Sequence, residues 1–205
     1  TTTSTVSTSV TEDADATTVT LSSATNGTAI TEGGSIVYTA TVNNAVTGTP
    51  LVVTLSNGTT ITIPVGQTTA NSAPVPVRAD DAYAQGTQTL TPVTITGTTG
   101  ANYEAVNTTG TINNTVVDDT DATTVTLTAS AGSVVEGNTI TYTATVTNAV
   151  TGTPLVITLD NGSTITIPVG ATSANSAPVI VRADDVYAQG NTTVVRSITG
   201  ALLAL

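Results

Sequence analysis

The side chains in this 205-residue chain that are capable of chemistry are almost all carboxylates. Fourteen Asp and Glu residues stand against three arginines, and the sequence holds no Lys, His or Cys. The usual general bases, Schiff-base amines and thiolate nucleophiles are therefore absent, so nothing is available to activate the many Ser and Thr hydroxyls. Carboxylate oxygens are the ligands that hard divalent cations such as Ca²⁺ prefer. The residue types indicate cation binding and argue against an enzyme.

The charge balance excludes two further classes of partner. The net charge of −11 leaves almost no cationic groups to replace the counterions of a nucleic acid. The same negative sign opposes binding to anionic membranes, and no apolar run reaches the roughly 18 residues of a membrane span. We therefore expect no nucleic acid, no direct membrane insertion and no small-molecule substrate.

A long internal repeat organises the sequence. Residues 32–86 align with residues 136–190, and 44 of the 55 aligned positions are identical. Upstream, DADATTVTL from Asp13 matches DTDATTVTL from Asp119 at an offset of 106 residues. A period of about 105 residues has the size of one β-sandwich domain and is too long for a solenoid or a propeller blade.

The phase of the repeat predicts three segments. Residues 5–11 (TVSTSVT) line up loosely with residues 111–117 (TINNTVV), so residues 1–11 are interpreted as the tail strand of a preceding repeat. Repeat 1 then spans residues 12–117 and repeat 2 spans residues 118–205. Repeat 2 ends in ALLAL where repeat 1 continues into its last strand, so we expect it to be truncated, with an exposed edge that favours self-association.

Alternating apolar and polar residues predict seven strands per repeat and no helix. In repeat 1 they cover residues 17–22, 35–42, 51–56, 59–65, 73–79, 87–96 and 103–112. Asn57-Gly58 predicts a two-residue type I′ hairpin turn. Seven short strands in about 100 residues predict an all-β fold of tandem immunoglobulin-like antiparallel sandwiches.

These strands determine where the carboxylates lie. If successive strands run up and down, most acids of repeat 1 fall at the end that adjoins repeat 2. The resulting metal-ligand candidates are Glu32, Asp80, Asp81, Asp118, Asp119 and Asp121. Six clustered carboxylates repel one another unless a cation neutralises them, and Ca²⁺ accepts irregular oxygen ligands. An isolated Asp-Asp pair is more often simply solvated, but the convergence favours a Ca²⁺ site.

The same pattern recurs in part elsewhere. Glu136, Asp184 and Asp185 form the corresponding half-site of repeat 2, which lacks linker carboxylates and is expected to bind Ca²⁺ weakly or not at all. Asp13 and Asp15, with Glu12, are the equivalent linker acids for a domain upstream.

Four sequence features together resemble a known family. They are the V-x-E-G pattern, the TITIPVGATS run, the DD-x-Y segment and the D-x-D-x-TTVTL linker. This combination resembles the immunoglobulin-like extender repeats of giant bacterial RTX adhesins, which are biofilm and surface proteins exported by type I secretion. The resemblance implies an extracellular location on a bacterial cell surface. It also implies neighbouring repeats as partners, and linkers that Ca²⁺ stiffens so that a terminal binding domain stands away from the cell.

The sequence departs from the family pattern in two places, and it leaves one alternative function open. Gln85 and Gln189 follow DD-x-Y where acids are common in related calcium sandwiches, and ALLAL does not resemble the family. The alternative function is an adhesion module that recognises a carbohydrate or protein. It has few aromatic side chains to use, because Trp and Phe are absent, and Tyr38 and Tyr142 occupy positions typical of a core.

Overall fold

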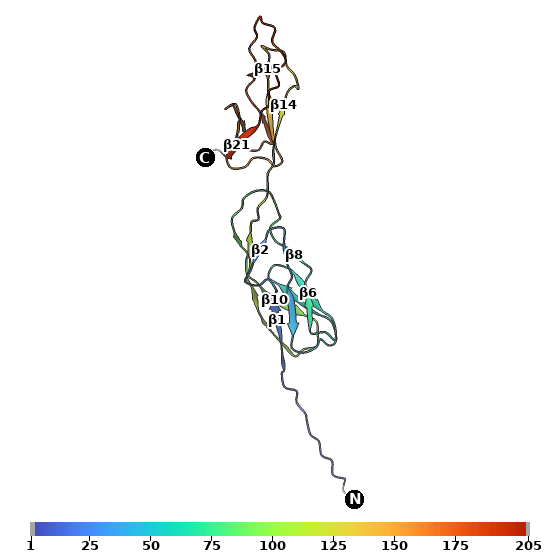
Figure 1. Cartoon of the computed structure of the whole chain (residues 1–205). Coiled ribbons are helices and arrows are strands. Elements are labelled where there is room, and N and C mark those ends of the chain that lie inside the picture. Colours follow the sequence, from blue (N-terminus) through green and yellow to red (C-terminus); the bar gives the residue numbers. More distant parts are fainter. Residues whose placement is uncertain (1–2, 204–205) are drawn as a thin grey trace. The chain divides into compact units, whose positions relative to one another are not determined.

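The computed structural model describes residues 3–203, and in that range the fold is all-β, with no helix. The chain forms two compact units that divide between Asp119 and Thr120 (Figure 1). Each unit is a small β-sandwich with its own hydrophobic core. The prediction of an all-β chain of sandwich domains is therefore confirmed.

Unit 1 consists of short strands arranged in several sheets. They are β1 (Ala16–Ser22), β2 (Ala29–Thr31), β3 (Ser35–Ile36), β4 (Thr39–Val42), β5 (Leu51–Leu55), β6 (Thr60–Ile63), β7 (Thr69–Asn71), β8 (Val75–Pro76), β9 (Gln88–Thr89), β10 (Val93–Thr99), β11 (Ala105–Thr109), β12 (Thr111–Ile112) and β13 (Thr115–Val117). The two main sheets have the orders β11-β1-β4-β7 and β12-β10-β5-β6. Most pairs are antiparallel, whereas β1 with β11 and β2 with β13 are parallel.

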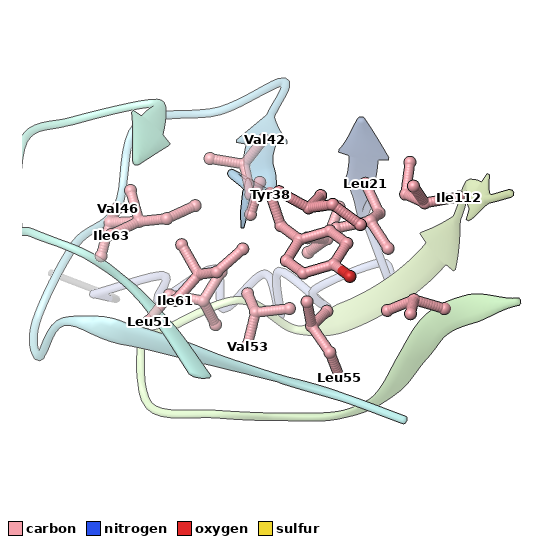
Figure 2. Packing of buried hydrophobic residues seen from close by; sticks show 14 of the residues in the cluster. Leu21, Tyr38, Val42, Val46, Leu51, Val53, Leu55, Ile61, Ile63 and Ile112 are labelled. Atoms are coloured by element: carbon pink, nitrogen blue, oxygen red, sulfur yellow. The ribbon is translucent and has the colours of Figure 1, made fainter. Parts of the chain in front are cut away.

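The core of unit 1 lies between these two sheets. β1 alternates buried and exposed residues, as period-two side chains must when one face is covered. Its inward residues Val19 and Leu21 pack in one cluster with residues of β5 and β6, among them Leu51, Leu55 and Ile63 (Figure 2). Burying a side chain of this size stabilises the fold by roughly 1.5–3 kcal/mol. The hydrophobic effect thus holds the sandwich that carries the loops.

A third sheet, of order β2-β13-β9, closes the end of unit 1 where the acids gather. β13 is its central strand, and the side chain of Val116 is fully buried there. β2 was not predicted as a strand, whereas β13 lies within residues 111–117, the segment that was aligned with the predicted tail strand at residues 5–11. Each is three residues long, too short for alternation to show, and each exists because of pairing between segments far apart in the chain.

The predicted type I′ hairpin turn at Asn57-Gly58 is wrong, and so is the same prediction for its counterpart in repeat 2, Asn161-Gly162. A type I′ turn needs a positive φ at both central residues, and Ala101 is the one non-glycine residue with positive φ among residues 3–203. The Gly58 amide donates to the Leu55 carbonyl at 2.9 Å, and Gly58 has φ of 83°. This is a type I turn followed by a left-handed glycine, the usual three-residue hairpin loop.

Unit 2 repeats most of this arrangement. Its strands are β14 (Val125–Ala129), β15 (Thr139–Ile140), β16 (Tyr142–Val146), β17 (Leu155–Leu159), β18 (Thr164–Ile167), β19 (Ser173–Asn175), β20 (Val179–Ile180) and β21 (Ile198–Leu203). They form sheets of order β14-β16-β19, β15-β20 and β18-β17-β21. Within residues 120–203 no strand corresponds to β2, β9, β11, β12 or β13. The described part of unit 2 therefore keeps the sandwich core and forms no sheet like β2-β13-β9.

Candidate metal centre

Four of the predicted ligands lie together after folding. One carboxylate oxygen from each of Glu32, Asp80, Asp119 and Asp121 can be chosen so that all four lie within 4.8 Å of one another. Glu32 follows β2, Asp80 follows Arg78 in the loop after β8, and the two linker acids follow β13. Residues separated by up to 89 positions in the sequence thus converge because β13 lies beside β2.

Glu32 is the buried member of this acidic cluster. Its side chain is 1% exposed, and its backbone amide donates to the Val117 carbonyl of β13 at 3.0 Å. Oε2 accepts a hydrogen bond from Arg78 Nε at 2.7 Å, whereas Oε1 has no hydrogen-bond partner among the described residues. A buried carboxylate oxygen without a partner is costly and needs an explanation. A cation held by this cluster would supply the missing partner.

The electrostatics of Glu32 point in the same direction. Burial raises its pKa above the ordinary 4.5, because desolvation disfavours the charged form. The Arg78 guanidinium opposes this rise, and the neighbouring Asp118 carboxylate adds to it. Loss of solvation and the like charge of Asp118 thus outweigh the arginine, so ionisation of Glu32 is disfavoured at this position.

Arg78 pairs with one member of the acidic cluster, Glu32, and with Asp118, which lies outside it. Its Nη2 lies 3.6 Å from Asp118 Oδ1, and its Nη1 donates to the Gly86 carbonyl at 3.0 Å. Because Arg78 stands just before Asp80 and Asp81 in the sequence, a local salt bridge with them would be the simplest expectation. Its partners are instead Glu32, 46 residues away, and Asp118, which only the long-range pairing of β13 brings near.

Asp81 and Asp118 have other partners than the acidic cluster. Asp81 Oδ1 accepts from the Tyr83 amide at 2.9 Å, and its Oδ2 accepts from the Gln85 side-chain amide. Asp118 Oδ2 accepts from the Gln85 backbone amide at 2.9 Å. Gln85, a departure from related calcium sandwiches, thus serves as a donor that holds two carboxylates in place. In the sequence, the glutamine that follows DD-x-Y is the feature from which this role could have been predicted.

Unit 2 reproduces only part of this geometry. Arg182 Nη2 lies 2.6 Å from Glu136 Oε2, as Arg78 lies beside Glu32, and Asp185 accepts from the Tyr187 amide at 2.8 Å. The Glu136 side chain is 21% exposed, against 1% for Glu32. Within residues 3–203, the acidic cluster that contains Glu32 is the only group of acids with metal-binding geometry. Asp184 belongs to no such group.

The upstream acids lie outside the acidic cluster as well. Glu12, Asp13 and Asp15 are exposed, in a segment that forms no strand. The backbone amide of Asp15 donates to Glu104 Oε2 at 2.7 Å.

Gly33 sets the distance between Glu32 and Asp80, and this yields a testable expectation. Gly33 has φ of 73°, and a Cβ added there would lie 2.9 Å from the Asp80 Cβ. Gly33→Ala should therefore lower unfolding stability by about 1–2 kcal/mol from backbone strain, and by a further ~1–3 kcal/mol from overpacking. It should also weaken cation binding by displacing Asp80. Chemical denaturation and calcium titration measure the two effects.

Gly58→Ala is the matched control for this substitution. Gly58 has φ of 83° with nothing within 4 Å of an added Cβ, so it carries the strain without the collision. Equal losses in the two variants would show that the approach of Gly33 to Asp80 is unimportant.

The geometry of the acidic cluster suits a calcium ion. Ca²⁺ holds oxygens at 2.3–2.6 Å, so ligands on opposite sides of it are at most roughly 4.6–5.2 Å apart. The 4.8 Å span of the four carboxylates fits within that sphere. Ca²⁺ takes six to eight oxygens, and three of the four side chains belong to exposed residues, where water can complete the shell. The donor set is thus chemically appropriate for a hard cation.

Comparison with known proteins identifies the family. No curated protein matches the chain. Among residues 3–203, no helix is long and apolar enough to cross a membrane. The LapA domain family, however, matches residues 15–120 and again residues 121–203. LapA is a large biofilm adhesin of Pseudomonas, and its domain in an all-β fold points to a non-enzymatic structural role. Because the two matches cover nearly the whole chain, the protein belongs to the LapA domain family and forms part of an adhesin located at the cell surface or outside the cell.

Proposed function

We propose that this protein is a structural spacer of an extracellular adhesin, and that Ca²⁺ stiffens the segment linking its two units. The first part of the proposal follows from the resemblance of this sequence to the immunoglobulin-like extender repeats of RTX adhesins. The acidic cluster of Glu32, Asp80, Asp119 and Asp121 supplies the site.

The observation that carries the proposal is the buried Glu32 carboxylate. Exposed acids are common without any ligand, but Glu32 is buried, its Oε1 lacks a hydrogen-bond partner among the described residues, and its oxygens face three further acids. Arg78 provides one positive charge against this group and is also shared with Asp118. A divalent cation would supply the missing charge and a ligand bond.

Calcium would act on the linker through Asp119 and Asp121. These two acids follow β13, and a cation that also bound Glu32 and Asp80 would add a direct connection between them and the body of unit 1. Without a cation the four carboxylates repel, which favours conformations in which the linker moves away. With the cation bound, the linker loses that freedom. A spacer needs this property, because a flexible connection would not hold a terminal domain at a fixed distance.

Calorimetric titration of the 205-residue chain with Ca²⁺, using Mg²⁺ as the control ion, tests the site. We expect Ca²⁺ to bind more tightly, because Mg²⁺ demands a shorter and more regular shell. Small-angle scattering of monomeric protein, free of interparticle interference, should give a narrower distribution of intramolecular distances with Ca²⁺ than with chelator. Unfolding stability should rise by about 2.7 kcal/mol at a hundredfold excess over Kd.

Two results would contradict the proposal separately. Absence of calcium binding at millimolar concentration would remove the site. Binding with an unchanged scattering profile would leave a calcium site but remove the stiffening mechanism.

The alternative function, recognition of a carbohydrate or protein, has one structural feature in its favour. A cavity of about 420 Å³ in unit 1 is lined by Tyr38, Val75, Arg78 and Leu90 among others. Tyr38 itself is buried in the core, as predicted, and its hydroxyl accepts from Asn57 at 3.3 Å. Saturable binding on a glycan array would favour this alternative over a spacer.

A further inference from the structure

The cavity in unit 1 is separate from the acidic cluster. Its volume is about 420 Å³, within the size range of pockets that hold small molecules, and none of the four clustered acids lines it. Most of its wall consists of aliphatic side chains, among them Ile36, Val93 and Ile112, which are at most 7% exposed. Protein interiors are normally packed without voids of this size. The fold therefore leaves room here for a molecule other than its own side chains.

The cavity is bordered by two sheet edges that do not pair with each other. β8 pairs with β3, β9 pairs with β13, and no ladder joins β8 to β9 within residues 3–203. Pro76 of β8 and Gln88 of β9 both line the cavity, and both are exposed. A small molecule can therefore enter from solvent between these edges without breaking the hydrogen bonds of a sheet.

A buried carboxamide gives the cavity an unused hydrogen-bond acceptor. Asn114 lines the cavity and is 6% exposed. Its Nδ2 donates to the Thr28 carbonyl at 3.1 Å and to the Thr25 carbonyl, so the loop at residues 25–28 binds the nitrogen end of the side chain. Oδ1 points away from that loop and has no hydrogen-bond partner among residues 3–203. A buried acceptor without a partner is uncommon, and a bound molecule with a donor would satisfy it.

A buried hydroxyl gives the cavity a donor. Tyr38 also lines the cavity, is 2% exposed, and places its ring between the two main sheets (Figure 2). Its oxygen accepts from Asn57 Nδ2 at 3.3 Å, and in the described part of the chain its own proton has no acceptor. Burial raises the pKa of Tyr38 above its ordinary 10.0, because desolvation disfavours the phenolate. The hydroxyl therefore keeps its proton at neutral pH and can donate it.

The charges beside the cavity disfavour a charged ligand. Arg78 is the one charged residue among those that line it. Its Nε lies 2.7 Å from Glu32 Oε2 and its Nη2 lies 3.6 Å from Asp118 Oδ1, so two carboxyl groups already pair with its single positive charge. An anionic head group would gain little from it, and a cationic one would be repelled.

The scarcity of polar groups in the wall also disfavours a sugar. A sugar carries several hydroxyls, and each one that enters an apolar cavity without a hydrogen-bond partner is costly. Asn114 and Tyr38 offer one acceptor and one donor. A single hydroxyl, which both donates and accepts, matches that pair.

We propose that this cavity binds a small uncharged molecule that has an apolar body and one hydroxyl group. The apolar body lies against the aliphatic wall, and its removal from water drives binding. The hydroxyl bonds to Asn114 Oδ1 and to the Tyr38 hydroxyl, the two polar groups that folding leaves incompletely satisfied. The inference does not rest on the calcium site, because it uses none of the clustered acids.

Phenol and benzene are the probes, since they share a ring and differ by the hydroxyl. Phenol has a pKa of about 10, so it is uncharged at pH 7. Titration of the full chain, followed by the chemical shifts of its amides, should show saturable changes centred on residues 75–77, 88–93 and 112–114. We expect phenol to bind with a Kd of about 1 mM or lower, and benzene to bind roughly threefold to tenfold more weakly.

Tyr38→Phe tests the hydroxyl contact, because it removes the donor and keeps the ring. Asn57 is exposed and can bond to water instead, so the variant should fold. Phenol should bind to it roughly threefold to tenfold more weakly than to wild type, whereas benzene should bind equally to both proteins. Equal weakening for the two probes would overturn the assignment of the hydroxyl.

Val75→Phe tests the location, because it fills the cavity from β8, and it should abolish binding of both probes. Val65→Phe is the matched control, at a valine that is 50% exposed and does not line the cavity, and it should bind like wild type. No saturable binding at about 10 mM phenol, or binding that Val75→Phe leaves unchanged, would overturn the proposal. The comparison of Tyr38→Phe with wild type remains decisive if Val75→Phe does not fold.

Discussion

Asp119→Asn should lower the calcium affinity of the chain by on the order of tenfold or more, the largest functional loss expected from one isosteric change. The substitution keeps the side-chain shape but removes a full negative charge from the four-carboxylate cluster, and calcium affinity depends on the number of charged ligands. The repulsion within the cluster falls at the same time, so apo stability should not decrease. Calorimetric titration measures the affinity, and denaturation in chelator measures the stability.

Asp160→Asn is the matched control for the affinity. Asp160 lies 3.9 Å from Arg196 in a hairpin loop of unit 2, and its counterpart in unit 1 is Ser56, not an acid. The calcium affinity of the Asp160→Asn variant should equal that of wild type. The calcium affinity of Asp81→Asn should fall between those of Asp119→Asn and Asp160→Asn. Asp81 is not in the cluster, but it accepts hydrogen bonds from the Tyr83 amide and the Gln85 side chain beside it. Equal losses in the Asp119 and Asp160 variants would mean that net charge, and not this cluster, governs binding.

Leu55→Ala should destabilise unit 1 by about 2–5 kcal/mol. Leu55 is 1% exposed and packs across the core from β5 (Figure 2), so its truncation leaves a cavity that the surrounding strands cannot fill. For a domain of this size each kcal/mol shifts Tm by roughly 4–8 °C. Calorimetric scans in chelator should therefore show one transition lowered by about 10 °C or more.

Leu159→Ala makes the equivalent change in unit 2, where Leu159 is also 1% exposed. If the two cores are independent, each variant lowers a different transition. Val65→Ala, at a residue that is 50% exposed, should leave both transitions nearly unchanged. Both leucine variants lowering a single shared transition would show that the units unfold together, contrary to their separate cores.

Most of the fold was predictable because the signal for it is local. Alternation over five to seven residues identified β1 and β5 almost to the residue. The strand predicted at 35–42 is divided instead into β3 and β4, because residues 35–36 pair with β8 while 39–42 pair with β1 and β7. Similarly, β7 lies within a stretch predicted as a loop. Such divisions depend on which neighbours are available, and the sequence pattern does not contain that information.

The candidate site was predictable to the level of one end of the domain. Antiparallel connectivity places Glu32, Asp80 and Asp119 at the same end whatever the details, and the structure brings these three together with Asp121. The choice among neighbouring acids was beyond the sequence. Asp80 and Asp81 are adjacent and chemically identical, yet one joins the cluster and the other accepts hydrogen bonds from its own loop.

The sequence by itself determined the all-β architecture, the repeat of about 105 residues, the absence of the common catalytic groups and the family resemblance. Each of these depends on residue type and spacing along the chain. The tertiary structure decided what β13 does. By pairing with β2 it buries Glu32, brings Asp118 to Arg78 and leads the chain into Asp119 and Asp121. Desolvation and close charge contacts arise only when segments some 85 residues apart become neighbours. For that reason a chain with so few charged residues builds one concentrated acidic cluster beside Glu32 and only part of one beside Glu136.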